Sequence, residues 1–383
     1  MATIEKLGKG SYEVRWDERD ADGKRHQRRK RFDRQGEAAD FVKALDADKP
    51  YEASRTVFNA WLDSWFEDYK PRLEVSTMLS YQHIVDICKA HFGAKPLDKV
   101  TPSMVEKFYT LLASPEHPLS KNPLTSSSVQ RYHALLHRAF VFALRDGLIR
   151  FNPCDRVDRP KSSRQEPVIP AEEQVQERFD ALAGTVVYLP CAISLVTGMR
   201  QSEVLGLKWS AVDLDHDKIA VRCVRQRLGK KRLEKVTLNA STRLVPEAPG
   251  CIERDHTKAK KNHALYIDPE LTALLRATKR TQMENRLRFG AAYTVTDYVC
   301  TSEDGRPVDA SAVAKAMAGV CRYHDLRHIN AIQLLKAGHS VATVADRLGH
   351  TTPQTTLNFY AHSLDDQDRA AAQTMTSIFH LKT

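Results

Sequence analysis

The hydrophobic pattern of the chain changes its period along the sequence. Near the N-terminus, Tyr12, Val14 and Trp16 alternate with polar residues, and this two-residue period is typical of a half-buried β-strand. The turn sequence "DADG" follows, and a second basic strand ends at Phe32 before "GEAADFVKAL", which has the spacing of a short helix. We therefore predict a three-stranded sheet plus one helix within residues 1–50.

A helical period replaces the alternation in the next part of the chain. Four runs carry it: "VFNAWLDSWFEDY", "TMLSYQHIVDICKAHF", "TPSMVEKFYTLLA" and "SSSVQRYHALLHRAFVFALRDGLI". In the last run, Leu135, Leu136, Ala139 and Phe140 recur at spacings of three and four, which places them on one helix face. We expect an all-α helical domain over residues 54–152.

The segment "FNPCDRVDRPKSSRQEPVIPAEE" then interrupts the periodicity. It is rich in Pro, Ser and charge, which favours a linker at residues 153–169. Beyond it, the helical run "VVYLPCAISLVTGMRQSEVLGLKW" precedes the strand-like "KIAVRCVRQ" and "ALYID", and further helices follow. The predicted fold class is multidomain: a small β-sheet plus helix, an all-α domain, and a mixed α+β domain over residues 170–383.

The charge of the chain narrows its partners. The formal net charge is +10 and the sequence pI is about 9.2, so the surface attracts polyanions, with nucleic acid the first candidate and an acidic membrane the second. No apolar stretch has the length of a membrane span, and the N-terminus "MATIEKLGKG" lacks the apolar core of a signal peptide. We expect a cytosolic protein without a membrane partner.

The seven cysteines are odd in number, scattered, and never arranged as CxxC. This pattern favours reduced structural thiols over a disulfide framework or a zinc site. No metal site is therefore expected.

The densest run of basic residues falls inside the predicted N-terminal sheet. Its members are Lys24, Arg25, Arg28, Arg29, Lys30 and Arg31. Such a run can be a solvated tail, but the flanking strand alternation favours a folded sheet that displays the charges to phosphates.

Four short motifs of the C-terminal region carry polar side chains that suit phosphate chemistry. They read "TGMRQSE", "HDLRH", "LGH" and "NFYAH", in that order. Their polar members are Arg200, Glu203, His324, Arg327, His350 and Tyr360. Each residue alone has an ordinary structural explanation, such as a helical ion pair or a buried helix face. Their joint order is what favours one shared site.

This order resembles the fingerprint of the tyrosine recombinase (phage integrase) family: TGxRxxE, a hairpin lysine, HxxRH, LGH, and a tyrosine followed two residues later by a histidine. The likeness runs from about residue 170 to 365. The helical region resembles the family's core-binding domain, which is SAM-like, and the N-terminal sheet resembles the arm-binding domain of the larger phage integrases.

The resemblance implies roles for the motif residues. Tyr360 would attack the scissile phosphate and form a 3′-phosphotyrosyl ester, which a DNA 5′-hydroxyl attacks later. Arg200 and Arg327 would hold the non-bridging oxygens with planar forks of N–H donors. His324 would help to remove the phenol's proton, because an unperturbed phenol has a pKa near 10. His350 would donate a hydrogen bond to the phosphate.

Two further roles follow from the same resemblance. The leaving 5′-oxygen needs a proton, and in "HTKAKKNHALYID" Lys258 matches the family's lysine. Lys260 and Lys261 stay open as alternatives, because the segment lacks the Ser and Arg that usually fix its register. Glu203 matches an acidic position that braces the active-site groups without touching DNA.

The expected function is site-specific recombination by a phage or mobile-element integrase, covering integration and excision without ATP, metal or another cofactor. Four protomers would assemble on DNA attachment sites of core and arm type, on the nucleoid in a bacterial cytoplasm. A host DNA-bending protein or an excision factor stays open as a further partner. The alternatives are a resolvase, a transposon recombinase, a type IB topoisomerase, and a DNA-binding regulator without catalysis.

Overall fold

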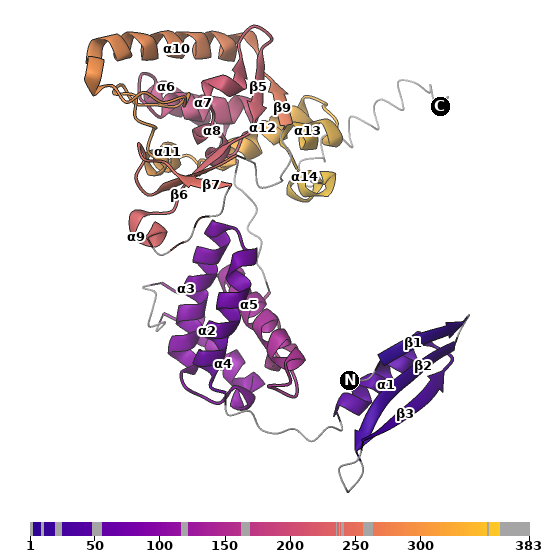
Figure 1. Ribbon diagram of the computed structural model, residues 1–383. Helices are drawn as coiled ribbons and strands as arrows, with labels where there is room; N and C mark the ends of the chain where they lie inside the picture. Colours follow the sequence, from indigo (N-terminus) through magenta and orange to yellow (C-terminus); the bar gives the residue numbers. More distant parts are fainter. Residues whose placement is uncertain are drawn as a thin grey trace, which may run out of the picture. The chain divides into compact units, whose positions relative to one another are not determined.

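Alternation of apolar and polar residues produces an antiparallel sheet at the N-terminus of the computed structural model (Figure 1). Its strands pair in the order β1 (Thr3–Gly8), β2 (Ser11–Arg19) and β3 (Arg25–Phe32), and helix α1 (Gln35–Ala47) follows. The ring of Phe41 on α1 packs against Trp16 and Phe32, with 5.1 Å between ring centroids in both pairs. The predicted sheet and helix are confirmed.

The structure describes residues 3–8, 11–19, 25–47, 56–115, 122–161, 169–234, 236, 238, 241–255, 263–350 and 352–360. The chain divides into two units, residues 1–164 and 165–383. Within the described residues, no helix is both long and apolar enough to cross a membrane. All seven cysteines are free thiols and five of them are buried, as predicted for structural thiols.

Helices with a shared apolar core make up the rest of the first unit. They are α2 (Phe58–Tyr69), η1 (Lys70–Arg72), α3 (Val75–Phe92), η2 (Leu97–Lys99), α4 (Pro102–Leu112), α5 (Ser126–Arg145) and η3 (Pro153–Arg156). The Oγ atoms of Thr101 and Thr125 accept backbone hydrogen bonds at the starts of α4 and α5, which explains where these helices begin. Leu136 and Phe140 are fully buried in the core, as the periodicity predicts.

The linker prediction begins too early. Residues 153–156 form η3, whose Cys154 packs into the helical core together with Val157. Asn152 holds this turn, because its Oδ1 accepts from the Cys154 amide and its Nδ2 donates to the His137 carbonyl. An apolar Cys and Val among Pro and charged residues gave too weak a periodic signal to mark this stretch as core.

The second unit mixes helices with two small sheets. It begins with α6 (Glu172–Leu182), α7 (Tyr188–Thr197), α8 (Gln201–Leu205) and η4 (Trp209–Ala211). Its strands and intervening helix are β4 (Val212–Asp213), β5 (Lys218–Val221), β6 (Val224–Arg227), α9 (Lys230–Leu233), β7 (Thr242–Leu244), β8 (Cys251–Arg254) and β9 (His263–Tyr266). It continues with α10 (Pro269–Phe289), η5 (Gly290–Ala292), α11 (Ala310–Lys315), α12 (Asp325–Lys336), α13 (Val341–Arg347) and α14 (Pro353–Tyr360).

The two sheets have the strand orders β4-β5-β9 and β6-β8-β7. Strand β8 ends where Arg254 pairs with Val224, and β9 begins where His263 pairs with Val221. Strand β8 is antiparallel to β6, and β9 is antiparallel to β5. Strands β5 and β6 are consecutive in the sequence. The lysine-rich segment between β8 and β9 therefore leaves one sheet opposite Val224 and enters the other opposite Val221, where the family resemblance implies a hairpin.

Candidate active site

A sharp turn delivers Arg200 from the end of α7. Gly198 ends that helix in the left-handed region at φ 70°, and a Cβ there would lie 2.4 Å from Leu348 Cδ2 and 2.9 Å from Asn330 Oδ1. Only glycine fits both the backbone angle and the close approach of these side chains. The turn is tied by the Met199 amide, which donates to Thr197 Oγ1 over 3.2 Å.

Glu203 braces Arg200 from behind. Its Oε1 accepts from Arg200 Nη1 at 2.8 Å and its Oε2 accepts from the Arg200 amide at 2.9 Å. Glu203 is 2% exposed, whereas the Arg200 side chain is 29% exposed. Arg200 stands at the N-cap of α8 and not on a helix face, so the sequence spacing predicted the pair but not its geometry. The carboxylate fixes one end of a guanidinium whose other side reaches solvent.

Arg327 ties two motifs together. It lies in the first turn of α12, is 4% exposed, and donates from Nη1 to the Gly198 carbonyl at 2.7 Å and from Nη2 to the Leu348 carbonyl at 2.5 Å. Each carbonyl stands two residues before another candidate, Arg200 in the first motif and His350 in the third. One guanidinium thus sets the spacing between the turns that carry those two side chains.

His324 stands at the N-cap of α12, one turn before Arg327, and lines a cavity of about 560 Å³ together with Arg200. The pKa of its imidazole is lowered, first by the loss of solvent around it and then by the guanidiniums of Arg327 and Arg200. The ring of His328 meets it edge-on at 5.2 Å between centroids. The neutral form that results can accept a proton.

His350 follows α13 through Gly349, which has φ 63°. Its Nδ1 lies 2.8 Å from Thr356 Oγ1 on α14. Burial, and then the charges of Arg327 and Arg200, lower the pKa of His350 to about 4. If the Thr356 hydroxyl donates to Nδ1, the ring proton resides on Nε2, which can then donate to an anion.

The remaining catalytic candidates lie at the edge of the description. Tyr360 is the last residue of α14, and only its backbone is described. Lys258, Lys260 and Lys261 lie outside the described residues, between β8 and β9. The structure thus brings together five of the candidates: Arg200, Glu203, His324, Arg327 and His350.

Sequence reasoning missed His263, the first residue of β9. Its imidazole approaches the "LGH" turn so closely that a Cβ on Gly349 would lie 2.9 Å from His263 Cε1. Burial lowers the pKa of His263, Glu203 raises it, and Arg200 and Arg327 lower it further, which places the ring among the site residues. Its position directly after the lysine-rich segment was the available signal.

The basic residues of the N-terminal sheet divide by strand register. Lys24 lies outside the described residues, and only the backbone of Arg25 is described. The side chains of Arg28, Arg29, Lys30 and Arg31 are exposed on β3. Lys30 lies 4.6 Å from the Phe41 ring of α1, whereas Arg29 and Arg31 occupy the opposite register, beside Arg15 and Glu13 of β2.

Glu13 organises the sheet face that α1 does not cover. Arg15 Nε donates to its Oε2 at 2.7 Å and Arg31 Nε donates to its Oε1 at 3.2 Å. These hydrogen bonds, that of Arg15 first, lower the pKa of Glu13. One buried acid thereby orders two exposed arginines.

Two family models match this chain. The model of the phage integrase family covers residues 171–367, and that of the phage integrase N-terminal SAM-like domain covers residues 57–113. A tyrosine recombinase XerC-like protein of Caldanaerobacter subterraneus subsp. tengcongensis is 26% identical over 278 residues, 67% of each chain. The ICEBs1 integrase of Bacillus subtilis is 22% identical over 337 residues, 84% of this chain and 82% of the relative.

Solved structures share the architecture. The Tn1549 transposon integrase in complex with a circular intermediate DNA is 18% identical, with a TM-score of 0.63 over 84% of this chain and 99% of that one. A lambda integrase tetramer bound to a Holliday junction is 15% identical, with a TM-score of 0.57 over 93% of this chain and 94% of that one. At these identities the likeness shows the fold alone, and it confirms the predicted multidomain fold class.

The motifs, the fold and the relatives together define a tyrosine recombinase, an enzyme that cuts and rejoins DNA at specific sites. The phage integrase model spans more than half of the residues, and the chain belongs to the phage integrase family.

Proposed function

We propose that this chain is the integrase of a phage or another mobile element, and that it cleaves DNA through a 3′-phosphotyrosine at Tyr360. The observation that carries the proposal is the convergence of Arg200, His324 and His350 around Arg327, which hydrogen-bonds the turns before two of them. Relatives such as the ICEBs1 integrase support the mobile-element assignment.

The two arginines would stabilise the charge that develops at phosphorus. A phosphodiester already carries one negative charge, and displacement places more on its non-bridging oxygens. Arg200, braced by Glu203, presents a directed guanidinium on the rim of the cavity that His324 also lines. Donors held in place before the reaction cost no reorganisation in the transition state, and this is the largest catalytic term in many enzymes.

The two histidines would divide acid–base work between them. His324 is the base for the tyrosine's proton, because the lowered pKa keeps its imidazole neutral near pH 7. His350, also neutral, donates to the phosphate from the nitrogen that does not face Thr356. Helix geometry puts positions 356 and 360 on one face of α14, and the contact of Thr356 with His350 shows that this face meets the "LGH" turn. The position of residue 360 on that face supports Tyr360 as the nucleophile.

The leaving 5′-oxygen would take its proton from a lysine of the segment between β8 and β9. Lys258 is the proposed donor, and Lys260 and Lys261 are the competing assignments. The pairing of Arg254 with Val224 and of His263 with Val221 supports this, because it fixes one end of the segment in each sheet. The second end, His263, lies beside the "LGH" turn.

The N-terminal sheet would bind arm-type DNA, the helical domain core-type DNA, and residues 170–383 would catalyse. The sheet face opposite α1 supports the first assignment, because Arg15 and Arg29 pair directly across its strands and Arg31 lies two residues further along β3. Sheets present such side chains to a DNA groove. Four protomers would act together on two attachment sites, and the similarity to a lambda integrase tetramer bound to a Holliday junction supports this number. A host DNA-bending protein or an excision factor stays open as a further partner.

A nicked suicide substrate carrying the core site tests the proposal. Native protein should form a covalent adduct, and Tyr360→Phe should form none while it binds the same DNA, because only the nucleophilic oxygen is lost. Tyr266→Phe is the matched control, since Tyr266 is 65% exposed on β9 and has no proposed role. An adduct of native yield from Tyr360→Phe would show that another residue is the nucleophile. No adduct from the native protein would favour a DNA-binding regulator.

A further inference from the structure

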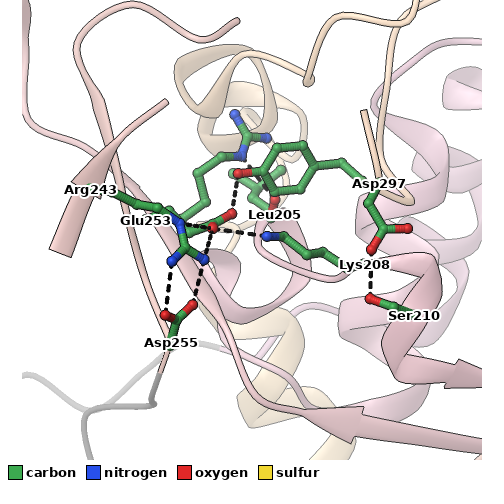
Figure 2. A network of polar contacts seen from close by, with 9 residues as sticks. Leu205, Lys208, Ser210, Arg243, Glu253, Asp255 and Asp297 are labelled. Carbon is green, nitrogen blue, oxygen red and sulfur yellow. Dashed lines mark hydrogen bonds and ion pairs between the residues drawn. The ribbon is translucent and has the colours of Figure 1, made fainter. Parts of the chain in front are cut away.

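A buried acid outside the proposed catalytic residues lies at the centre of a network of polar contacts (Figure 2). Glu253 on β8 is 3% exposed and accepts from Lys208 Nζ at 2.8 Å and from Arg243 Nε at 2.8 Å. The Tyr298 hydroxyl donates to its other oxygen. Three segments that are distant in sequence therefore meet on one carboxylate.

Arg243 extends the network to the last described residue before the lysine-rich segment. Its Nη1 donates to Asp255 Oδ2 at 2.9 Å and its Nη2 donates to Asp255 Oδ1 at 2.5 Å, while Nη2 also reaches Glu253 Oε1 at 2.5 Å. This parallel, two-bonded geometry fixes the direction of a carboxylate as well as its position. The end of β8 is thus anchored to β7.

The opposite side of the network contacts α8, the helix that directly follows Arg200. Lys208 follows α8 closely, and its backbone bridges to Tyr298. Arg225, a fully buried arginine on β6, stacks 5.2 Å from the Tyr298 ring centroid and donates from Nε to the Leu205 carbonyl at 2.8 Å, the last residue of α8. Figure 2 shows Leu205 and Lys208 on one side of Glu253 and Asp255 on the other.

The two carboxylates of this network form ion pairs with basic side chains: Glu253 with Lys208 and Arg243, and Asp255 with Arg243. Burial alone would raise the pKa of Glu253, but the hydrogen bonds from Lys208, Tyr298 and Arg243 outweigh it and lower the pKa to about 2. Cys223, Glu253 and Asp255 bring metal-ligand atoms within 4.8 Å of one another, yet both carboxylates already bind Arg243. The cluster is thus a clamp between elements and not an open cation site.

We propose that Glu253 and Arg243 are positioning residues for strand cleavage: they fix the start of the lysine segment, at Asp255, relative to α8, the helix that contains Glu203 and follows Arg200. The inference rests on the proposed function in one respect, namely that a residue of this segment protonates the leaving 5′-oxygen. If the clamp sets that geometry, weakening it impairs proton delivery to the leaving group and leaves the phosphate contacts of Arg200 intact.

The test compares two leaving groups in single-turnover cleavage by the full chain. One nicked core-site duplex has the ordinary 5′-oxygen at the scissile position, and the other has a bridging 5′-sulfur, which leaves as a thiolate without a proton. Arg243→Ala should slow cleavage of the oxygen substrate about ten-fold or more, because misplacing a catalytic group by about 1 Å can cost up to about 10²-fold. On the sulfur substrate the same variant should come within about three-fold of native.

Matched variants separate a clamp from a general loss of stability. Arg288→Ala is the control, because Arg288 is another surface arginine that pairs with an acid, Glu303. The side chain of Arg288 is 60% exposed, close to the 54% of Arg243. Arg288→Ala should behave as native on both substrates. Tyr298→Phe removes only the hydroxyl donor to Glu253 and should reproduce the selective defect in milder form. Thermal unfolding of each variant, followed by circular dichroism, tests whether the chain is folded at the temperature of the assay.

The outcomes are decisive for each claim separately. Equal loss on both substrates, or no loss at all, from Arg243→Ala overturns the positioning role. Lys258→Ala, measured beside it, tests the lysine assignment: recovery on sulfur supports Lys258, and recovery of Lys260→Ala instead moves the proton donor by two residues. A selective defect in Arg243→Ala supports the clamp whichever lysine is the donor.

Discussion

The candidate active site around Arg327, called the cleft from here on, and the N-terminal sheet are both rich in arginine, but they hold it in opposite ways. In the cleft, Arg327 is 4% exposed and is fixed on two backbone carbonyls, while Glu203 braces Arg200. On the sheet, Arg29 and Arg31 are exposed. Arg31 and Arg15 both donate hydrogen bonds to one acid, Glu13. The cleft fixes the direction of each donor, whereas the sheet displays positive charge.

Arginine therefore plays a different physical role in each of the two regions. A fixed guanidinium can match the oxygens of one phosphate in its transition state, so its shape matters as well as its charge. An exposed guanidinium neutralises a phosphate and releases counterions, so its charge is what matters. The predictions below separate these two uses of arginine.

The largest effect should come from removing the sheet altogether. A chain that begins at Ala53 keeps the helical domain and the proposed catalytic domain but loses the sheet, which is the proposed second DNA-binding domain. Two linked heads commonly bind paired sites 10²–10⁴-fold more tightly than either alone, so affinity for DNA with core and arm sites should fall by about that factor. Cleavage of an isolated core site should be spared. Equal binding of the long site by both chains, in gel-shift titrations, would remove the arm-binding assignment.

Arg327→Lys should cost the cleft both activity and stability. The ammonium cannot serve both carbonyls and a phosphate, and a buried carbonyl left without a partner costs about 1–3 kcal/mol. Cleavage should fall by about 10²-fold or more, the scale for loss of a preorganised donor. Arg322→Lys is the control, because Arg322 lies two residues before the "HDLRH" motif and its side chain is 75% exposed. Native cleavage rates from Arg327→Lys would contradict its place in the site.

The histidines of the cleft predict how its stability depends on pH. His328 and His350 have pKa values of about 4 in the folded protein, lowered first by burial and then by nearby positive charges. The unfolded chain takes up protons near pH 6.5, so folded stability should fall as the pH drops from about 6.5 to 4, by roughly 2–3 kcal/mol for each histidine.

Hydrogen exchange of the α12 amides at pH 8 and pH 5 measures this effect. His350→Gln should reduce the difference between the two conditions by about one histidine's share. His339→Gln is the control, because His339 is exposed on the turn after α12. An unchanged pH dependence in His350→Gln would mean that this imidazole has the same pKa in the folded protein as in the unfolded chain.

The smallest effect should come from a single arginine on the sheet. Arg29→Ala should flatten the plot of log affinity against log salt on arm-site DNA by about one unit of slope, as expected for one phosphate contact. Core-site cleavage should not change. Fluorescence anisotropy titrations across a salt series measure the slope, and the same slope in native and variant protein would place Arg29 outside the DNA contact.

Local patterns predicted the elements well and the contacts between them poorly. The alternation around Val14 and the spacing of Leu136 and Phe140 predicted a strand and a helix, because burial follows those periods directly. The family motifs predicted that Arg200, His324, Arg327 and His350 would lie close together. That Arg327 binds backbone carbonyls could not be predicted, because carbonyls are present at every residue and leave no trace in the sequence.

Residues that act through packing were missed for a similar reason. His263 lies beside Gly349 because β9 pairs with β5. This pairing is a property of strand register and not of any local motif. Glu253 reads in sequence as one more polar strand residue, and its burial depends on partners that come from three other segments, Lys208, Arg243 and Tyr298. Long-range pairing decides both.

One paired substitution tests the central contrast most directly: Arg200→Lys in the cleft and Arg29→Lys on the sheet, each keeping the charge and removing the guanidinium fork. Single-turnover cleavage and arm-site affinity are measured for both variants at one salt concentration. Arg200→Lys should lose about 10²-fold or more in cleavage while binding DNA normally, and Arg29→Lys should stay within about two-fold of native in both assays. Near-native cleavage by Arg200→Lys, or an equal defect in Arg29→Lys, would contradict the distinction between directed and displayed arginines.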